Sequence, residues 1–461
     1  MDILRLSYLY ILFVASVSIV SYKKGIYLIW ITLLLVPTII LEQIIKMKLS
    51  MLTILLLGSI ISELRFSERR TAWKDFFSNN QNAIIIYLFI SFTIVFLSQT
   101  VPLNVQFIRL VEEIAMLLFA LQTFFLAKNN EKSALALKFI ICGAIVYNIF
   151  YSIYFELIVG VNPAGMPLYI LLGQDDNDFI VDMIDSERGG LDFRAQTVYR
   201  HPLSLGQYML VLLPLFLMKG KYFSNLIFSF LICVLIILSG SRGAMAPMVL
   251  ILIVSMIKSS HINFRKLVIL FAVIVTVISS IPDKKWDKFT KEAEPFVAGL
   301  AFWDDEKQKE NNVSGSSMEM RFDQINAAFE EIGANPIFGR GYGYRDYWIF
   351  MHNDLHPDLL GFESVFLLYL VERGWIGLIF FFFMAYFIYR LCKNETISTI
   401  TVLLVFLGYL TSIIMTGVRP LTLLFVCLAY SIICGIAPHK EEDSNSLVES
   451  SQSVSNTSTS L

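Results

Sequence analysis

The chain has 461 residues, of which 56% are hydrophobic and only 16% are charged, and its formal net charge is −2. Soluble domains average about 25% charged residues, so this composition excludes a large soluble enzyme. The near-neutral charge also excludes the basic surface that nucleic-acid binding requires. Because a membrane-spanning helix needs about 20 predominantly apolar residues, the composition predicts an all-α polytopic membrane protein.

Apolar runs follow one another along the chain at residues 4–21, 26–43, 49–62, 83–99, 107–126, 137–158, 203–218, 226–239, 244–257, 267–281, 375–390, 397–416 and 419–436. Lys and Arg in short loops mark the cytoplasm, and alternation puts the basic links at 65–74, 128–138, 219–221, 258–266 and 390–393 on one side. The run at 26–43 has lysines at both ends, Lys23-Lys24 and Lys46/Lys48. We therefore expect about 12 or 13 transmembrane helices, with the side of the N-terminus open.

The same alternation places two long polar segments outside the cytoplasm, and long loops are uncommon unless they are functional. The final segment is rich in Ser, Thr and Asn, a composition typical of disorder. We therefore expect N-terminal transmembrane helices, a first outer loop, further transmembrane helices, a large outer loop, C-terminal transmembrane helices and a disordered cytoplasmic tail, in residues 1–158, 159–202, 203–281, 282–363, 364–438 and 439–461.

A helix is predicted in the second outer loop, from Ser317 to Gly333, where Gly333 supplies a C-cap and a proline follows. At about 100° per residue one apolar face contains Met318, Phe322, Ile325, Phe329 and Ile332. Arg321 lies at the edge of this face. It either lays its stem on lipid or core, or aims its charge into a cleft between this helix and the membrane domain.

Arg242 lies in a very short turn, Ser239-Gly240-Ser241-Arg242-Gly243, between two apolar runs. A charge at this depth is costly unless it is paired, reaches the headgroups or faces a ligand. The adjacent glycines allow a ligand to approach the backbone N–H groups, which favours an anion.

Other arginines also fall outside the cytoplasm: Arg188, Arg194, Arg200, Arg340, Arg345, Arg373 and Arg419. Planar guanidinium groups bind phosphate oxygens in a bidentate manner, so a phosphate-bearing lipid is the expected ligand. For Arg109, which precedes Glu112 and Glu113, a structural ion pair is the favoured interpretation.

Candidate acid–base groups in the outer loops include His201, His352 and His356. The last two are four residues apart, a spacing that suits a metal on a helix, but Pro357 disfavours helix at His356. We therefore expect no metal.

The order of these features resembles the O-antigen polymerase and O-antigen ligase superfamily of bacterial polysaccharide assembly. The resemblance rests on five stretches between about residues 190 and 380: 194–197 (RAQT) with 201–208 (HPLSLGQY), 238–244 (LSGSRGA), 321–329 (RFDQINAAF), 335–343 (NPIFGRGYG) and 370–377 (LVERGWIG). The first 150 residues match only in hydropathy.

The resemblance implies a multi-pass glycosyltransferase, related to the GT-C type, in the bacterial inner membrane. It would use an undecaprenyl-diphosphate-linked oligosaccharide as donor and a second one as acceptor at the periplasmic face, without metal, cofactor or nucleic acid. A chain-length regulator is a further expected partner. The implied diphosphate-binding residues are Arg242, Arg321 and Arg194. In the mechanism that we expect, Arg194 or Arg200 assists Arg242 and Arg321.

Glu363 and His352 are the leading candidates for the catalytic base, followed by His356. The ligase branch has a His-Asn pair about nine residues before the Glu-x-Gly that matches Glu372–Gly374. Here that position holds Glu363-Ser364, and His352-Asn353 lies eleven residues earlier. This difference favours a polymerase.

Two alternatives stay open. One is an O-antigen ligase that transfers the glycan to lipid-A core or another acceptor. The other is a flippase for the same lipid-linked sugar, which would place charges along a cavity in mid-span. We expect spans nearly free of ionisable residues, which favours surface chemistry over transport.

Overall fold

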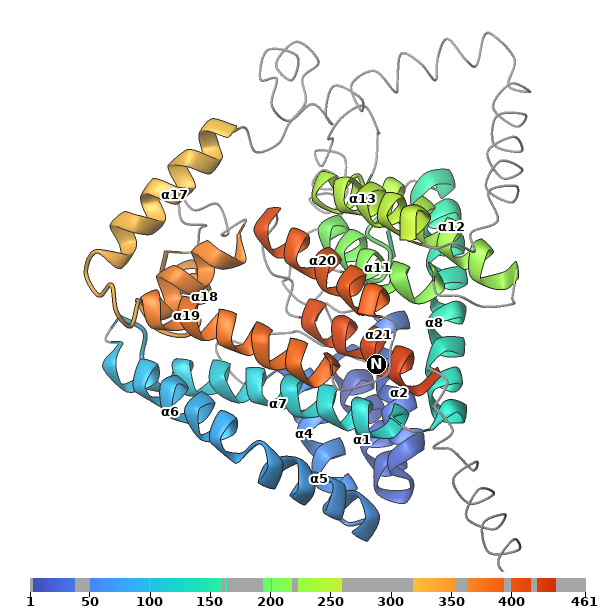
Figure 1. Cartoon of the computed structure of the whole chain (residues 1–461), viewed down its shortest axis with the longest axis horizontal. Coiled ribbons are helices and arrows are strands. Elements are labelled where there is room, and N and C mark those ends of the chain that lie inside the picture. Colours follow the sequence, from blue (N-terminus) through green and yellow to red (C-terminus); the bar gives the residue numbers. More distant parts are fainter. Residues whose placement is uncertain are drawn as a thin grey trace, which may run out of the picture.

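The computed structural model describes residues 3–37, 50–98, 100–128, 130–159, 162–163, 194–199, 201–217, 223–258, 318–352, 364–393, 399–415 and 421–436. Within these ranges the regular structure is helical and contains no strand. Figure 1 shows the helices gathered into one bundle, with α17 and α18 beside α19 at one edge and α11, α12 and α13 at another. The predicted all-α class is confirmed.

The helices of the N-terminal part are α1 (Ile3–Val20), α2 (Tyr22–Leu35), α4 (Met51–Glu63), α5 (Ser67–Asn79), α6 (Gln81–Leu97), α7 (Leu103–Ala127), α8 (Glu131–Tyr151) and the π-helix η1 (Ser152–Val159). Those of the C-terminal part are α11 (Pro202–Leu217), α12 (Phe223–Leu238), α13 (Arg242–Lys258), α17 (Met318–Ile332), α18 (Tyr344–His352), α19 (Val365–Lys393), α20 (Thr399–Met415) and α21 (Thr422–Ile436).

Three helical segments in the described residues are long and apolar enough to cross a bilayer: Leu103–Ala127, Glu131–Val159 and Phe366–Phe383. A fourth is possible if α5 and α6, which meet at 77°, form one broken span. Shorter apolar helices account for other expected runs, including α4, α11 and α21. The chain is thus a polytopic membrane protein, and the expected total of 12 or 13 spans stays a prediction.

Aromatic side chains from four helices form the centre of the core. Trp30 of α2 packs edge-on against Phe425 of α21, with ring centroids 5.9 Å apart, and lies 5.5 Å from Phe119 of α7. Tyr208 of α11 stacks on Phe425 with ring centroids 4.4 Å apart. The indole N–H of Trp30 donates to Thr123 Oγ1 (3.0 Å), so its polar atom is satisfied inside the core.

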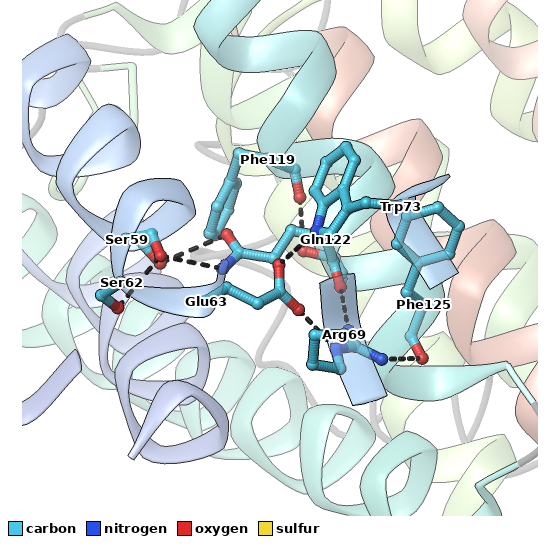
Figure 2. Close-up of polar contacts among 9 residues, drawn as sticks. Ser59, Ser62, Glu63, Arg69, Trp73, Phe119, Gln122 and Phe125 are labelled. Carbon is cyan, nitrogen blue, oxygen red and sulfur yellow. Dashed lines mark hydrogen bonds and ion pairs between the residues drawn. The ribbon is translucent and has the colours of Figure 1, made fainter. Parts of the chain in front are cut away.

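A buried ion pair fixes α5 to the rest of the bundle (Figure 2). Glu63, the last residue of α4, binds Arg69 of α5 through Nε at 2.5 Å and accepts a hydrogen bond from Trp73 Nε1 at 3.0 Å. The remaining Arg69 donors reach the carbonyls of Gln122 and Phe125 on α7. Most of the basic link expected at residues 65–74 therefore belongs to α5, and one of its cations, Arg69, is neutralised inside the protein.

Two contacts show which helix ends lie together. Tyr22, at the start of α2, packs against Phe66 beyond α4, with ring centroids 5.0 Å apart. Ser50, at the start of α4, donates its backbone N–H to Glu112 near the start of α7 (3.1 Å). Residues Lys23 and Lys24 therefore lie at the α5 end of the bundle, and the start of α4 lies at the opposite end.

Candidate functional site

The turn between α12 and α13 is held by Arg194, which comes from a separate stretch of the chain. Arg194 Nε donates to the carbonyl of Ser239 (3.1 Å) and Nη2 to that of Gly240 (3.5 Å). The next residue, Ala195, donates its N–H to the carbonyl of Leu238 (2.9 Å). Gly240 has φ of +59°, and a Cβ there would lie 3.0 Å from Arg194 Nε, so a larger residue would be strained and crowded.

α11 also approaches this turn closely. A Cβ on Gly206 would lie 2.9 Å from both Ser239 Oγ and Ser241 Cβ, so glycine is needed for α11 to pack here. Arg242 is the first residue of α13, and a helix N-terminus favours anions because its first N–H groups and dipole point outward. The structure thus brings together two of the five stretches that carry the resemblance, 194–197 with 201–208 and 238–244.

A buried carboxylate, Glu156, holds the loop that carries Arg194. Glu156 Oε1 accepts hydrogen bonds from the backbone N–H groups of Gln196 (3.0 Å) and Thr197 (2.8 Å) and from Asn162 Nδ2 (2.9 Å). Thr197 adopts a φ of +53°, which these bonds and the one from Asn162 Nδ2 to the Thr197 carbonyl help to stabilise. Glu156 therefore fixes the backbone from which Arg194 reaches the turn.

A second assembly forms where α19 is broken. Gly374 has φ of +60° and ψ of −164°, which interrupts the helix. Backbone N–H groups beyond the break bind carbonyls of the preceding loop, Trp375 to Pro336 (3.0 Å) and Ile376 to Ile337 (3.3 Å). In return, the N–H groups of Arg340 and Gly341 bind carbonyls of α19, those of Val371 and Glu372, both at 2.8 Å. The stretches 335–343 and 370–377 thus form one unit.

Arg373, next to this break, joins α19 to α7. Its guanidinium binds Glu113 through two nitrogens (3.2 and 2.5 Å) and lies 4.2 Å from the ring centroid of Tyr342 and 4.1 Å from that of Tyr369. Tyr87 of α6 donates to the same carboxylate (3.1 Å). This bidentate, stacked arrangement requires arginine rather than lysine.

Other arginines of this region are also paired with acids. Arg109 binds Glu112 at 2.6 Å and Asp346 of α18 at 2.9 Å, which confirms the predicted structural ion pair. Arg340 binds Glu331 of α17 at 3.0 Å. These cations therefore contribute to the docking of α17 and α18 on α7 and α19.

α17 lies against the α19 unit with Gln324, Ala327, Ala328 and Ile332 buried. Its Glu331 accepts a hydrogen bond from Tyr344 Oη (3.0 Å). Burial and the neighbouring Glu331 carboxylate raise the pKa of Tyr344 above its usual value, so the hydroxyl stays neutral and donating. The predicted helix bounds, Ser317 to Gly333, are confirmed to within a residue at each end.

His352 is the last residue of α18, where its ring stacks on Trp348 at a centroid distance of 3.9 Å. Its Nδ1 lies 3.0 Å from the Trp348 carbonyl, which can only accept. Nδ1 must therefore carry the proton in the neutral ring, leaving Nε2 as the nitrogen that can accept one. The side chain is exposed.

The other predicted site residues are placed less completely. Arg242 and Arg321 lie in the first turns of α13 and α17, and the structure describes only their backbone. Arg200, His356 and Glu363 lie outside the described residues, as does the predicted tail at 439–461. Arg194 and the turn of Arg242 are brought together, whereas the meeting of Arg321 with them stays a prediction.

Sequence reasoning missed Glu156 and the Glu113–Arg373 pair as parts of this region. Glu113 and Arg373 lie inside two candidate spans, so these spans are less free of charge than expected. A signal was available for both, since a carboxylate or arginine within an apolar helix requires a partner. The identity of that partner depends on packing and could not be found from spacing.

The fold defines a polytopic helical membrane protein with two sets of buried polar contacts, one at the turn between α12 and α13 and one at the break in α19. Residues 227–382 match the family described as O-antigen ligase, and the match includes four of the five stretches that carry the resemblance. This confirms the resemblance to the O-antigen polymerase/ligase superfamily and supports an enzyme of that type. A comparison with curated proteins finds no match.

Proposed function

We propose that the chain is a polymerase of O-antigen or another surface polysaccharide. It joins oligosaccharide repeat units carried on undecaprenyl diphosphate at the periplasmic face of the bacterial inner membrane. In this proposal the diphosphate of the donor lies beside Arg242 at the N-terminus of α13, with Arg321 as a second cation. Arg194 holds the turn, and Arg200 assists.

In the reaction the terminal sugar hydroxyl of a second lipid-linked unit attacks the anomeric carbon of the donor glycan. The bond between that carbon and the diphosphate oxygen breaks, a new glycosidic bond forms with inversion, and undecaprenyl diphosphate leaves. The guanidinium groups stabilise the negative charge that develops on the leaving oxygen, which is commonly the largest contribution to such catalysis. The bonds broken and formed in this transfer balance without ATP or a metal.

The proton of the attacking hydroxyl requires an acceptor. Glu363 and His352 are the leading candidates, followed by His356. The contact between Nδ1 of His352 and the Trp348 carbonyl leaves Nε2 as the ring nitrogen that can accept a proton, as a general base requires. Exposure of His352 keeps it accessible to a substrate.

The observation that carries the proposal is the pair of hydrogen bonds that Arg194 donates to the carbonyls of Ser239 and Gly240. Two stretches that are distant in the sequence are joined there, directly before the helix N-terminus at which Arg242 begins α13. A prepared turn, helix N–H groups and a guanidinium together make an anion site suited to a diphosphate.

The test is Arg242→Lys, which keeps the charge but removes the fork geometry. We expect short glycans or single repeat units on a gel of glycolipids from cells that carry only this variant, because diphosphate binding by the guanidinium is lost. Arg65→Lys is the matched control, since Arg65 is exposed between α4 and α5. Polymer of normal length in the Arg242→Lys strain, at normal protein level, would overturn the proposal.

A ligase is the second candidate, because the matching family is described as O-antigen ligase. A deletion strain separates the two: loss of a polymerase leaves single repeats attached to the acceptor, whereas loss of a ligase leaves none attached. A flippase is distinguished by incubating the purified protein with lipid-linked repeats, since only a polymerase lengthens the glycan.

A further inference from the structure

Three sectors divide the surface of α17. Gln324, Ala327, Ala328 and Ile332 are buried against the protein. Asp323, Asn326 and Glu330 form an exposed polar sector. Between them lies an exposed apolar sector of Phe322 (60% exposed), Ile325 (38%) and Phe329 (48%). At about 100° per residue the apolar sector is contiguous and borders both of the others.

The apolar sector of α17 continues onto α19. The rings of Phe329 and Trp375 lie side by side, with centroids 6.4 Å apart. Trp375 is 46% exposed, and Ile379 (67%) and Phe382 (55%) follow it on the same face. These three residues follow the break at Gly374, so the exposed apolar sector of α17 continues directly onto an exposed apolar face of α19.

The length of α19 beyond Trp375 is consistent with a position of Trp375 at the edge of the hydrocarbon core. From Trp375 to Lys393, the last residue of α19, the helix rises about 27 Å at about 1.5 Å per residue. The hydrocarbon core is about 30 Å thick, so Trp375 lies near the interface opposite the basic end of α19. Tryptophan is enriched at this depth.

We infer that α17 is an interfacial helix. Its exposed apolar sector, formed by Phe322, Ile325 and Phe329, contacts the acyl chains of bilayer lipid. One side of α17 packs on protein, one faces lipid and one faces water, the arrangement of a helix that lies in the plane of a membrane surface. The acidic polar sector faces the water, away from the headgroups. This inference does not depend on the proposed reaction.

The test is spin-label accessibility in vesicles of phosphatidylethanolamine and phosphatidylglycerol. In a chain whose native cysteines are replaced by serine, single labels are placed by Phe322→Cys, Ile325→Cys and Phe329→Cys. Asp323→Cys, Asn326→Cys and Glu330→Cys are the matched controls on the same helix. We expect the collision rate with oxygen to exceed that with a water-soluble nickel chelate at the first three positions, and the reverse at the controls. Equal access of the chelate to both sets would overturn the inference.

A second measurement needs no removal of cysteines. Phe329→p-benzoylphenylalanine and Glu330→p-benzoylphenylalanine are irradiated in the same vesicles, and adducts are identified by mass spectrometry. Lipid adducts at position 329 and their absence at position 330 support the inference. A covalent dimer at position 329 would overturn it, because a second copy of the chain would then cover the sector.

Discussion

The guanidinium of Arg194 donates hydrogen bonds to the carbonyls of Ser239 and Gly240, whereas Arg242 begins the helix that follows. In the proposed reaction, Arg194 is therefore a positioning residue for the turn, and Arg242 is the residue proposed to touch the diphosphate. Sequence reasoning gave both the same role, because only the fold shows that one arginine supports the turn of the other.

Arg194→Lys is expected to lower both thermal stability and polymer length. A lysine ammonium cannot reproduce the planar fork that binds two successive carbonyls, and the Gly240 turn then loses its support. Arg242→Lys should shorten the polymer and leave the melting temperature of the detergent-solubilised protein unchanged. Equal melting temperatures for wild type and Arg194→Lys would contradict the positioning role.

Among the elements, α19 depends on its break at Gly374. A Cβ at this position would clash with the Ile337 carbonyl oxygen, and the φ of +60° is rarely adopted by other residues. The break lets α19 exchange backbone hydrogen bonds with the loop at residues 335–343. The docking of α17 and α18 follows from this exchange.

Gly374→Ala should reduce the free energy of unfolding by at least about 1–3 kcal/mol, the range for a strained backbone, with a further loss from the clash. Thermal unfolding in detergent measures the change. Gly143→Ala in α8 is the control, because a Cβ there meets no atom within 4 Å and alanine favours helix. A Gly374→Ala protein as stable as Gly143→Ala would show that the break is not required.

At the scale of the whole molecule, two sets of polar contacts join the ends of helices that are distant in the sequence. The end of η1, the start of α11 and the turn between α12 and α13 meet through Glu156 and Arg194. The starts of α4 and α7 meet α18 through Glu112, Arg109 and Asp346. The alternation from basic links assigns all of these ends to the outside.

Reporter fusions test this orientation. Alkaline phosphatase fused after residue 310 should be active and the same reporter fused after residue 130 or 220 inactive, because the enzyme matures only outside the cytoplasm. Green fluorescent protein at the same positions should give the reverse pattern. Fluorescence from the fusion after residue 310 would place the second outer loop in the cytoplasm and remove the periplasmic site.

The sequence was sufficient for features with local signals. The bounds of α17 follow from apolar spacing, a C-cap glycine and the next proline, and the Arg109–Glu112 pair from a spacing of three residues. It was insufficient where burial depends on another element. Much of the apolar face of α17 is exposed because smaller residues pack on the protein, and Glu156 finds its partners about forty residues away.

The ion pair between Glu63 and Arg69 has a consequence for biogenesis. Its two members are only six residues apart, so the carboxylate that ends an apolar helix is neutralised by the segment synthesised directly after it. A lone charge is costly for a segment entering a bilayer. Arg69 can therefore neutralise Glu63 as soon as α5 has been synthesised, before the ribosome has produced the α7 carbonyls that later complete the coordination of Arg69.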